Sequence, residues 1–228
     1  MKIKEPIILL NFKAYSKAND KNAIKLARVA NDIAKKYGIS IIVAPQFHDL
    51  KDIRKFKKIF VFSQHIDPIE TSGAFTGHIV LENILKFVDG SLLNHSEKKI
   101  PLKEIKMGIE ILRKFKKISV VCASNVKEAK KIAKLNPDYI AIEPPELIGS
   151  GISVSKAKPQ IITKTIEEVK KVNRKVKVLC GAGISNEDDV KRALELGAKG
   201  VLIASAFVKS KNPKLFLEKI AKVIKNFK

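Results

Sequence analysis

Short apolar runs alternate with longer amphipathic stretches along the whole chain. The apolar runs are rich in Ile, Val and Leu, which is typical of strands buried on both faces of a parallel sheet. They predict strands at Pro6–Leu10, Ile39–Val43, Ile59–Phe62, Ser91–Leu93, Ile118–Cys122, Tyr139–Ile142, Val176–Leu179 and Gly200–Ala204. The stretches between them have apolar residues at helical spacing. They predict helices at Asp20–Tyr37, Phe47–Phe56, Gly77–Phe87, Leu102–Phe115, Val126–Leu135, Pro159–Val172, Asn186–Leu196 and Pro213–Phe227.

Eight strand–helix repeats favour one of two α/β architectures, a closed (β/α)8 barrel or an open, doubly wound sheet. No Gly-x-Gly-x-x-Gly turn follows the first strand, so the best support for a dinucleotide-binding open sheet is missing. The eighth repeat completes the number that a barrel needs. The sequence therefore predicts a single (β/α)8 barrel domain over residues 1–228. Local signals agree, since Ser185-Asn-Glu-Asp188 matches a helix capping box.

Composition narrows the class of protein. The 228 residues are 45% hydrophobic, which is enough for a sizeable core. No apolar run is long enough to cross a bilayer, and the first residues lack the apolar stretch of a signal peptide. Cys122 and Cys180 both end strand-like runs, at a spacing that matches no zinc motif. We expect a cytoplasmic protein with two free thiols, no metal and no membrane association.

The formal net charge of +22 suggests a different hypothesis, that the chain binds nucleic acid. Basic clusters such as Lys55-Phe-Lys-Lys58 and Lys114-Phe-Lys-Lys117 fit that hypothesis. However, the lysines are spread over the polar faces of many predicted helices, and no aromatic-rich strand resembles an RNA-binding platform. We expect no specific nucleic-acid partner and a positive field that attracts a phosphorylated metabolite.

Reactive side chains follow several of the predicted strands. In a (β/α)8 barrel the carboxyl ends of the strands meet at one face, where active sites lie. Glu143 ends the sixth strand and opens a loop that runs through Pro144, Pro145, Gly149 and Gly151, so a carboxylate on rigid scaffold stands beside a hinged segment. The other candidates at this face are Asn11, Lys13, Asn94, His95, Glu97, Gly181, Gly183, Ser185, Ala204 and Ser205.

Three of these segments resemble triosephosphate isomerase, namely Asn11-Phe-Lys13, Asn94-His-Ser-Glu97 and Glu143-Pro-Pro-Glu-Leu-Ile-Gly-Ser-Gly151. The archaeal branch is the closer match, through Ala44-Pro-Gln46, Gln64-His-Ile-Asp67, Cys180-Gly-Ala-Gly-Ile-Ser185 and Leu202-Ile-Ala-Ser205. The resemblance covers essentially the full chain, with the motifs in the same order. It implies a TIM barrel that interconverts dihydroxyacetone phosphate and glyceraldehyde 3-phosphate in glycolysis and gluconeogenesis, without a cofactor.

The resemblance also implies a role for each residue. Glu143 resembles the catalytic base, and His95 resembles the electrophile of this family, a neutral imidazole whose pKa is lowered by a helix N-terminus. A short helical turn at residues 96–99 could supply that N-terminus here. Lys13 resembles the cation that balances the charge of phosphate and enediolate, and Asn11 a neighbouring substrate contact. Glu97 resembles a buried acidic partner, although a plain helix-start carboxylate is an alternative. The positions that resemble the phosphate-binding backbone of the family are Ile148, Gly149, Gly183, Ser185, Ala204 and Ser205. Ser185 could instead be only a helix cap.

The segment 65–79 resembles the loop through which members of this family form dimers. Phe75 near its tip would be an unusual aromatic residue to leave in water. An alternative is that the loop folds back and covers its own barrel. Because the chain is short, as in archaeal members, the resemblance implies a homotetramer built from dimers, with a homodimer as the alternative.

The alternative enzyme hypothesis is that the chain is another phosphate-binding (β/α)8 enzyme, such as one from tryptophan or histidine synthesis. Such an enzyme would share the small-residue turns after strands seven and eight. It has no need of the Asn-x-Lys segment at Asn11–Lys13 or of the Asn-His-Ser-Glu segment at Asn94–Glu97. The two segments therefore favour the isomerase.

Overall fold

The computed structural model describes residues 2–147 and 153–227 and contains a closed barrel of eight parallel strands. The strands pair in sequence order, and β8 pairs with β1 to close the barrel, with Ile7 opposite Gly200. The predicted closed barrel is thereby confirmed over the open sheet. The strands are β1 (Ile7–Asn11), β2 (Ser40–Ala44), β3 (Phe60–Ser63), β4 (Gly90–Leu93), β5 (Ile118–Ala123), β6 (Tyr139–Ile142), β7 (Lys177–Cys180) and β8 (Gly200–Ile203).

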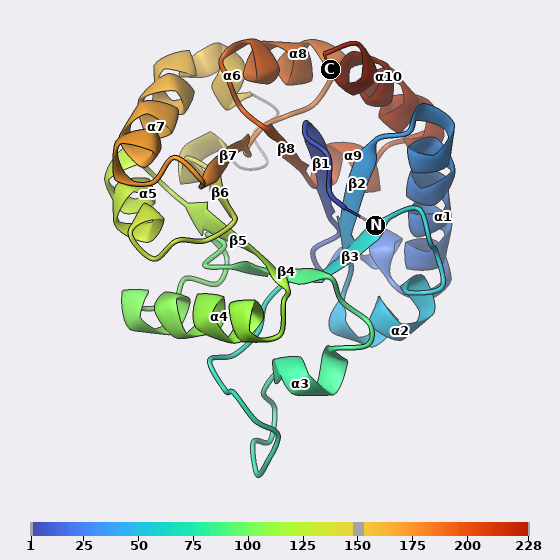
Figure 1. Ribbon diagram of the computed structural model, residues 1–228. Coiled ribbons are helices and arrows are strands. Elements are labelled where there is room, and N and C mark those ends of the chain that lie inside the picture. Colours follow the sequence, from blue (N-terminus) through green and yellow to red (C-terminus); the bar gives the residue numbers. More distant parts are fainter. Residues whose placement is uncertain (1, 148–152, 228) are drawn as a thin grey trace.

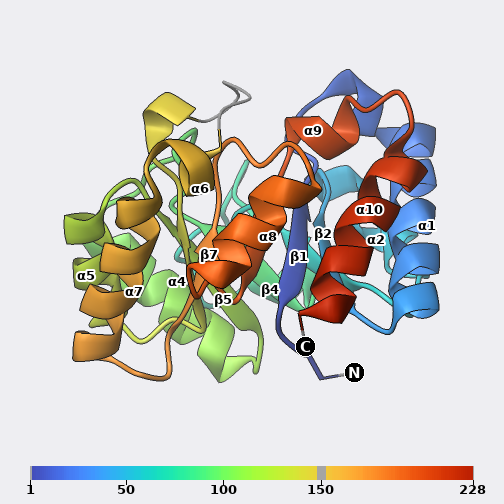
Figure 2. The ribbon, with the colours of Figure 1, turned by 90° about the horizontal axis from the view of Figure 1, so that it is seen from above.

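Helices surround the strands in a ring, as Figure 1 shows along the barrel and Figure 2 from the side. Figure 2 also shows α6 and α9 at one end of the barrel and both chain termini toward the other. The helices are α1 (Asp20–Tyr37), α2 (Leu50–Ile53), α3 (Leu81–Ile84), α4 (Leu102–Lys114), α5 (Val126–Ala133), α6 (Val154–Ala157), α7 (Pro159–Val172), α8 (Glu187–Glu195), α9 (Ser205–Val208) and α10 (Pro213–Asn226). Short 3-10 turns are η1 (Ser16–Ala18), η2 (Phe47–Asp49) and η3 (Pro145–Leu147).

Each strand buries both of its faces, which explains the continuous apolar runs. In β1, Ile7 and Leu9 belong to the cluster that fills the barrel, whereas Ile8 and Leu10 belong to the layer between strands and helices. Successive strand residues point to opposite faces, so one run serves both layers. The result is a rigid frame whose strand ends hold side chains in fixed positions.

Two predicted helices were wrong in extent. The predicted helix over residues 77–87 is reduced to α3, because Gly77 has a positive φ of 82° and Val80 is extended. The predicted helix over residues 47–56 is divided into η2 and α2. The helices α6 and α9 were not predicted, since a single turn is too short to display helical periodicity.

The predicted capping box, with Ser185 as the N-cap, was wrong by one residue. The N-cap of α8 is Asn186, whose side-chain oxygen accepts a hydrogen bond from the Asp189 N–H at 3.0 Å. Asp189 in turn accepts from the Ser185 N–H and hydroxyl, both at 2.9 Å. The end of α1 follows expectation, because Gly38 is left-handed with φ 65°.

The loop between β3 and α3 extends away from the barrel (Figure 1). Residues 71–78 are exposed, and Phe75 keeps 44% of its surface accessible. Hydrogen bonds hold the base of the loop, from the Ile79 N–H to Asp67 and from the Ser72 N–H to Glu82. The expectation that the loop could cover its own barrel is therefore wrong for the single chain.

Cys122 and Cys180 are buried and unbonded to each other, as predicted. Within residues 2–147 and 153–227, none of the helices combines the length and apolar character that crossing a bilayer requires.

Candidate active site

Three predicted catalytic or substrate-contacting side chains lie buried at the carboxyl ends of strands. Asn11 is the last residue of β1, His95 stands two residues after β4, and Glu143 directly follows β6. All three are more than nine-tenths buried. Because parallel strands end at one face of the barrel, side chains from distant parts of the sequence meet there.

Glu143 and His95 face each other across a gap. The Glu143 Oε2 atom lies 3.7 Å from His95 Nε2, which is too long for a hydrogen bond. Both atoms are buried, and neither has a hydrogen-bond partner. Buried polar atoms without partners are costly, so this pair is suited to a ligand that supplies polar groups to both.

The surroundings of His95 determine which of its nitrogens carries the proton. The Glu97 N–H donates to His95 Nδ1 at 3.2 Å, so Nδ1 acts as the acceptor of a neutral ring. The hydrogen then sits on Nε2, the atom that faces Glu143. The short helical turn expected at residues 96–99 is a single turn, in which the Lys98 N–H donates to the His95 carbonyl at 2.8 Å, and no longer helix follows it directly. The N–H that acts on the ring comes from this turn.

Glu143 occupies space that a glycine leaves free. A Cβ atom on Gly181 would lie 2.4 Å from Cγ of Glu143 and 2.9 Å from its Oε1. The Glu143 N–H donates to the Ala123 carbonyl at 2.8 Å, which anchors the backbone to β5. On the same side, burial and the nearby Glu143 carboxylate raise the pKa of the Cys122 thiol, so Cys122 stays neutral.

Lys13 is held in a left-handed backbone conformation, with φ 48°. Its N–H donates to Asn11 Oδ1 at 3.0 Å. Its carbonyl accepts from the side-chain amides of Gln46, at 2.8 Å, and Gln64, at 3.0 Å. Left-handed conformations are unfavourable for residues other than glycine, and these three bonds offset that cost.

The Lys13 ammonium pairs with Glu97 Oε1 at 2.6 Å. The expected burial of Glu97 was wrong for the single chain, since 58% of its side chain is exposed. The reason is its position on the turn beyond β4, at the rim of the barrel. No helix begins at Glu97 either, because α4 starts at Leu102.

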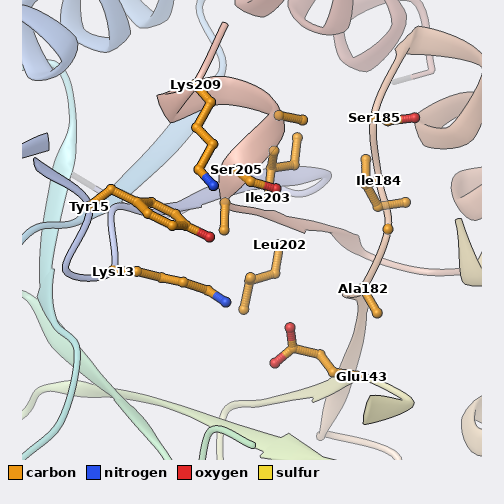
Figure 3. Close-up of a pocket in the computed structure, with 13 residues that line it drawn as sticks. Lys13, Tyr15, Glu143, Ala182, Ile184, Ser185, Leu202, Ile203, Ser205 and Lys209 are labelled. Carbon is orange, nitrogen blue, oxygen red and sulfur yellow. The ribbon is translucent and has the colours of Figure 1, made fainter. Parts of the chain in front are cut away.

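A cavity of about 290 Å³ collects most of the predicted residues (Figure 3). Its walls include Lys13, Glu143, Gly183, Ser185, Ala204 and Ser205. Ala182 and Gly183 are both left-handed, with φ 64° and 69°, which turns the chain sharply after β7. The hydroxyl of Ser185 donates a hydrogen bond to the Asp189 carboxylate, which favours a structural role for Ser185 at the start of α8. Ile148 and Gly149 lie outside the described residues.

A second hollow of about 250 Å³ adjoins the first, and Lys13 lines both. Asn11, His95 and Glu97 line this second hollow. The structure thus brings the predicted catalytic and substrate-binding residues that it describes to the two hollows, while the candidates Asn94 and Gly181 line neither of them.

Sequence reasoning missed four residues around these hollows. Tyr15 and Lys209 line the first cavity, and Gln46 and Gln64 line the second. Gln46 and Gln64 follow strands two and three, so their position at the carboxyl face was a usable signal. Tyr15 and Lys209 lie farther along the chain from the ends of strands one and eight, so the same signal was weaker for them.

One group within the described residues has the geometry to hold a metal ion, and it shares no residue with either hollow. It consists of Asp20, His48 and Asp49. Asp49 already accepts the Asp20 N–H, and burial raises its pKa. The two hollows are lined by two histidines, His65 and His95, and by two carboxylates, Glu143 and Glu97, of which Glu97 is paired with Lys13.

Comparison with known proteins gives a consistent result. Residues 6–224 match the family model described as triosephosphate isomerase. A triosephosphate isomerase from Methanothermus fervidus is 49% identical over 216 residues, covering 94% of this chain and 97% of that protein. One from Methanocaldococcus jannaschii is 45% identical, covering 96% and 100%. A third, from Methanobrevibacter smithii, is 45% identical, covering 92% and 94%.

Proposed function

The chain belongs to the triosephosphate isomerase family, and from that premise we propose that it interconverts dihydroxyacetone phosphate and glyceraldehyde 3-phosphate through an enediolate, with Glu143 as the base. The observation that carries this proposal is the pair of buried, unpartnered atoms Glu143 Oε2 and His95 Nε2. A carboxylate beside a hydrogen-bond donor can deprotonate a carbon while the donor polarises the adjacent carbonyl.

The proposed reaction moves protons only. Glu143 removes a proton from C1 of dihydroxyacetone phosphate, and His95 Nε2–H donates a hydrogen bond to the carbonyl oxygen on C2. Glu143 then returns a proton to C2, while His95 passes a proton from one enediolate oxygen to the other. No electron is gained or lost overall, so the reaction needs no cofactor.

Lys13 and Asn11 support the charge that develops. The Lys13 ammonium lies at the junction of the two hollows, where it can offset the enediolate and the phosphate together. Asn11 holds the Lys13 backbone and lines the second hollow. We propose Gly183, Ala204 and Ser205 as the turn residues that receive the phosphate, since small residues let backbone N–H groups approach an anion.

The substitution Glu143→Gln tests the base. An amide cannot accept the proton, so we expect kcat to fall by about 10²–10⁴. Binding of inorganic phosphate, measured by calorimetry, should change little. Glu146→Gln is the matched control, because it makes the same chemical change at an exposed position three residues away. A Glu143→Gln enzyme with nearly normal kcat would remove Glu143 from the mechanism.

We also propose that the enzyme acts in the cytoplasm as a homotetramer of dimers. Two buried, reduced cysteines suit a reducing compartment. The exposed loop 71–78 with Phe75 supports a self-association surface. For nucleic acid we propose no specific partner, because the lysines lie on α1, α4, α7 and α10 without a base-reading element.

A further inference from the structure

A second lysine, Lys209, reaches the first cavity from the segment that follows β8. It lines the same cavity as Lys13 and Glu143. Figure 3 shows the amine ends of Lys13 and Lys209, and the hydroxyl of Tyr15, turned toward the same space. The cavity therefore receives two cationic side chains from two different elements of the barrel.

The two lysines differ in how far their charge is already neutralised. Lys13 is paired with Glu97 at 2.6 Å. Among the residues that the structure describes, no carboxylate lies within ion-pair distance of Lys209. Lys209 is thus the cation at this cavity whose charge remains available to an anionic ligand.

An aromatic ring holds the Lys209 amine in place. Its Nζ atom lies 4.4 Å from the centroid of the Tyr15 ring, which is a cation–π contact. Such a contact orients an ammonium and leaves its N–H groups able to donate elsewhere. The backbone N–H of Lys209 donates to the Ser205 carbonyl at 2.8 Å. The Lys209 side chain therefore begins close to the turn that carries the proposed phosphate contacts.

Closure of the barrel brings the two residues together. Tyr15 lies in the segment after β1, and Lys209 lies in the segment after β8. These strands are neighbours only because β8 pairs with β1. The pairing of Tyr15 with Lys209 therefore belongs to the carboxyl face of the closed barrel, beside Ala204 and Ser205.

We propose that Lys209, oriented by Tyr15, binds the phosphate group of the substrate and sets the preference of the cavity for a phosphorylated ligand. The proposal rests on the proposed function and extends it. A triose phosphate is anionic at one end and reacts at the other, and Glu143 and His95 mark the reacting end. Lys209 supplies charge at the opposite end, while Lys13 divides its charge between Glu97 and the substrate.

The test compares Lys209→Met with Lys209→Arg and with Lys211→Met. Lys211 is exposed and outside the cavity, so Lys211→Met removes the same charge without the contact. Two quantities are measured, the KM for glyceraldehyde 3-phosphate and the Kd for inorganic phosphate by calorimetry. For Lys209→Met we expect both to rise about tenfold, with kcat falling less than KM rises. Lys209→Arg should restore most of the binding, and Lys211→Met should leave both values unchanged.

Tyr15→Leu tests the positioning role. Removal of the ring leaves the Lys209 charge in place but frees the side chain, so we expect a rise of about two- to fivefold in the phosphate Kd. The double variant Tyr15→Leu, Lys209→Met should be no worse than Lys209→Met alone. A fully additive loss would show that Tyr15 acts independently and would overturn its assignment.

Phosphate binding separates this proposal from the proposed function. Wild-type Kd for phosphate in Lys209→Met, or an equal loss in Lys211→Met, would overturn the assignment of Lys209. If the wild-type chain lacked isomerase activity while Lys209→Met still lost phosphate, the phosphate site would stand and the proposed reaction would fall. Circular dichroism melting of each variant verifies that the fold is retained.

Discussion

At the scale of single residues, Gly181 decides where the proposed base can sit. A methyl group there would overlap Cγ of Glu143 at 2.4 Å. Because Glu143 follows a strand that is fully buried, the carboxylate is the part that must move. Displacement of a reacting group by about 1 Å can lower the rate by about 100-fold.

We therefore expect Gly181→Ala to lower kcat by about 10- to 100-fold while the barrel still folds. Steady-state kinetics at saturating glyceraldehyde 3-phosphate measures the effect. Gly108→Ala on α4 is the control, since its added methyl group would meet the side chain of Leu93 and not the site. An unchanged kcat in Gly181→Ala would show that Glu143 does not need the position that it occupies here.

At the scale of elements, Glu128 in the first turn of α5 holds the segment that precedes His95. Its carboxylate accepts from Asn94 Nδ2 at 2.9 Å, from the Ser124 N–H at 2.7 Å and from Lys99. Burial acts to raise the pKa of Glu128, but the bonds from Lys99, Ser124 and Asn94 outweigh it and the pKa is lowered. The ionised form is therefore favoured in the folded state.

A lowered folded-state pKa stabilises the protein above the unfolded pKa, near 4.5, and that contribution is lost as pH falls through the folded value. We expect Glu128→Gln to lower the free energy of unfolding by about 1–3 kcal/mol at neutral pH. The difference from wild type should shrink in acid below the ordinary glutamate pKa. Urea unfolding at both pH values measures it.

Glu110→Gln is the control for this change, because Glu110 is exposed and its nearest lysine nitrogen is 3.9 Å away. Its effect should stay within about 0.5 kcal/mol at either pH. An equal loss of stability for Glu128→Gln at neutral and acid pH would show that shape, and not charge, holds Asn94 in place.

At the scale of the whole molecule, charge and loop geometry act on assembly in opposite directions. The net charge of +22 opposes association of identical chains, and salt screens that repulsion. Phe75 on the projecting loop favours association, because its burial by a partner contributes roughly 1.5–3 kcal/mol. We expect the loop to form the proposed dimer and the proposed tetramer to be the weaker level of assembly.

Sedimentation at low and high salt should show the tetramer strengthening as salt rises. Phe75→Ser should weaken the dimer by at least about tenfold. Phe227→Ser removes a similarly exposed aromatic residue near the end of α10 and should not weaken it. A fully active monomer in both salts would contradict the whole assembly, whereas a dimer that never associates further would contradict only the tetramer.

The sequence alone determined the barrel and the location of its reactive residues. Strands buried on both faces must be apolar throughout, so eight runs could be recognised without knowledge of their neighbours. The carboxyl ends of parallel strands share one face, so Asn11, Lys13, His95 and Glu143 could be assigned to a common site. The motifs around them pointed to the family that the comparisons confirm.

Tertiary structure alone decided the contacts between residues from different strands. Gln46 and Gln64 hold Lys13 in its left-handed conformation, and Tyr15 meets Lys209 across the seam between β1 and β8. The predicted helix over residues 77–87 was shortened because a projecting loop takes up its first residues. Such contacts depend on barrel closure and on backbone direction at loop ends, neither of which leaves a periodic pattern in the sequence.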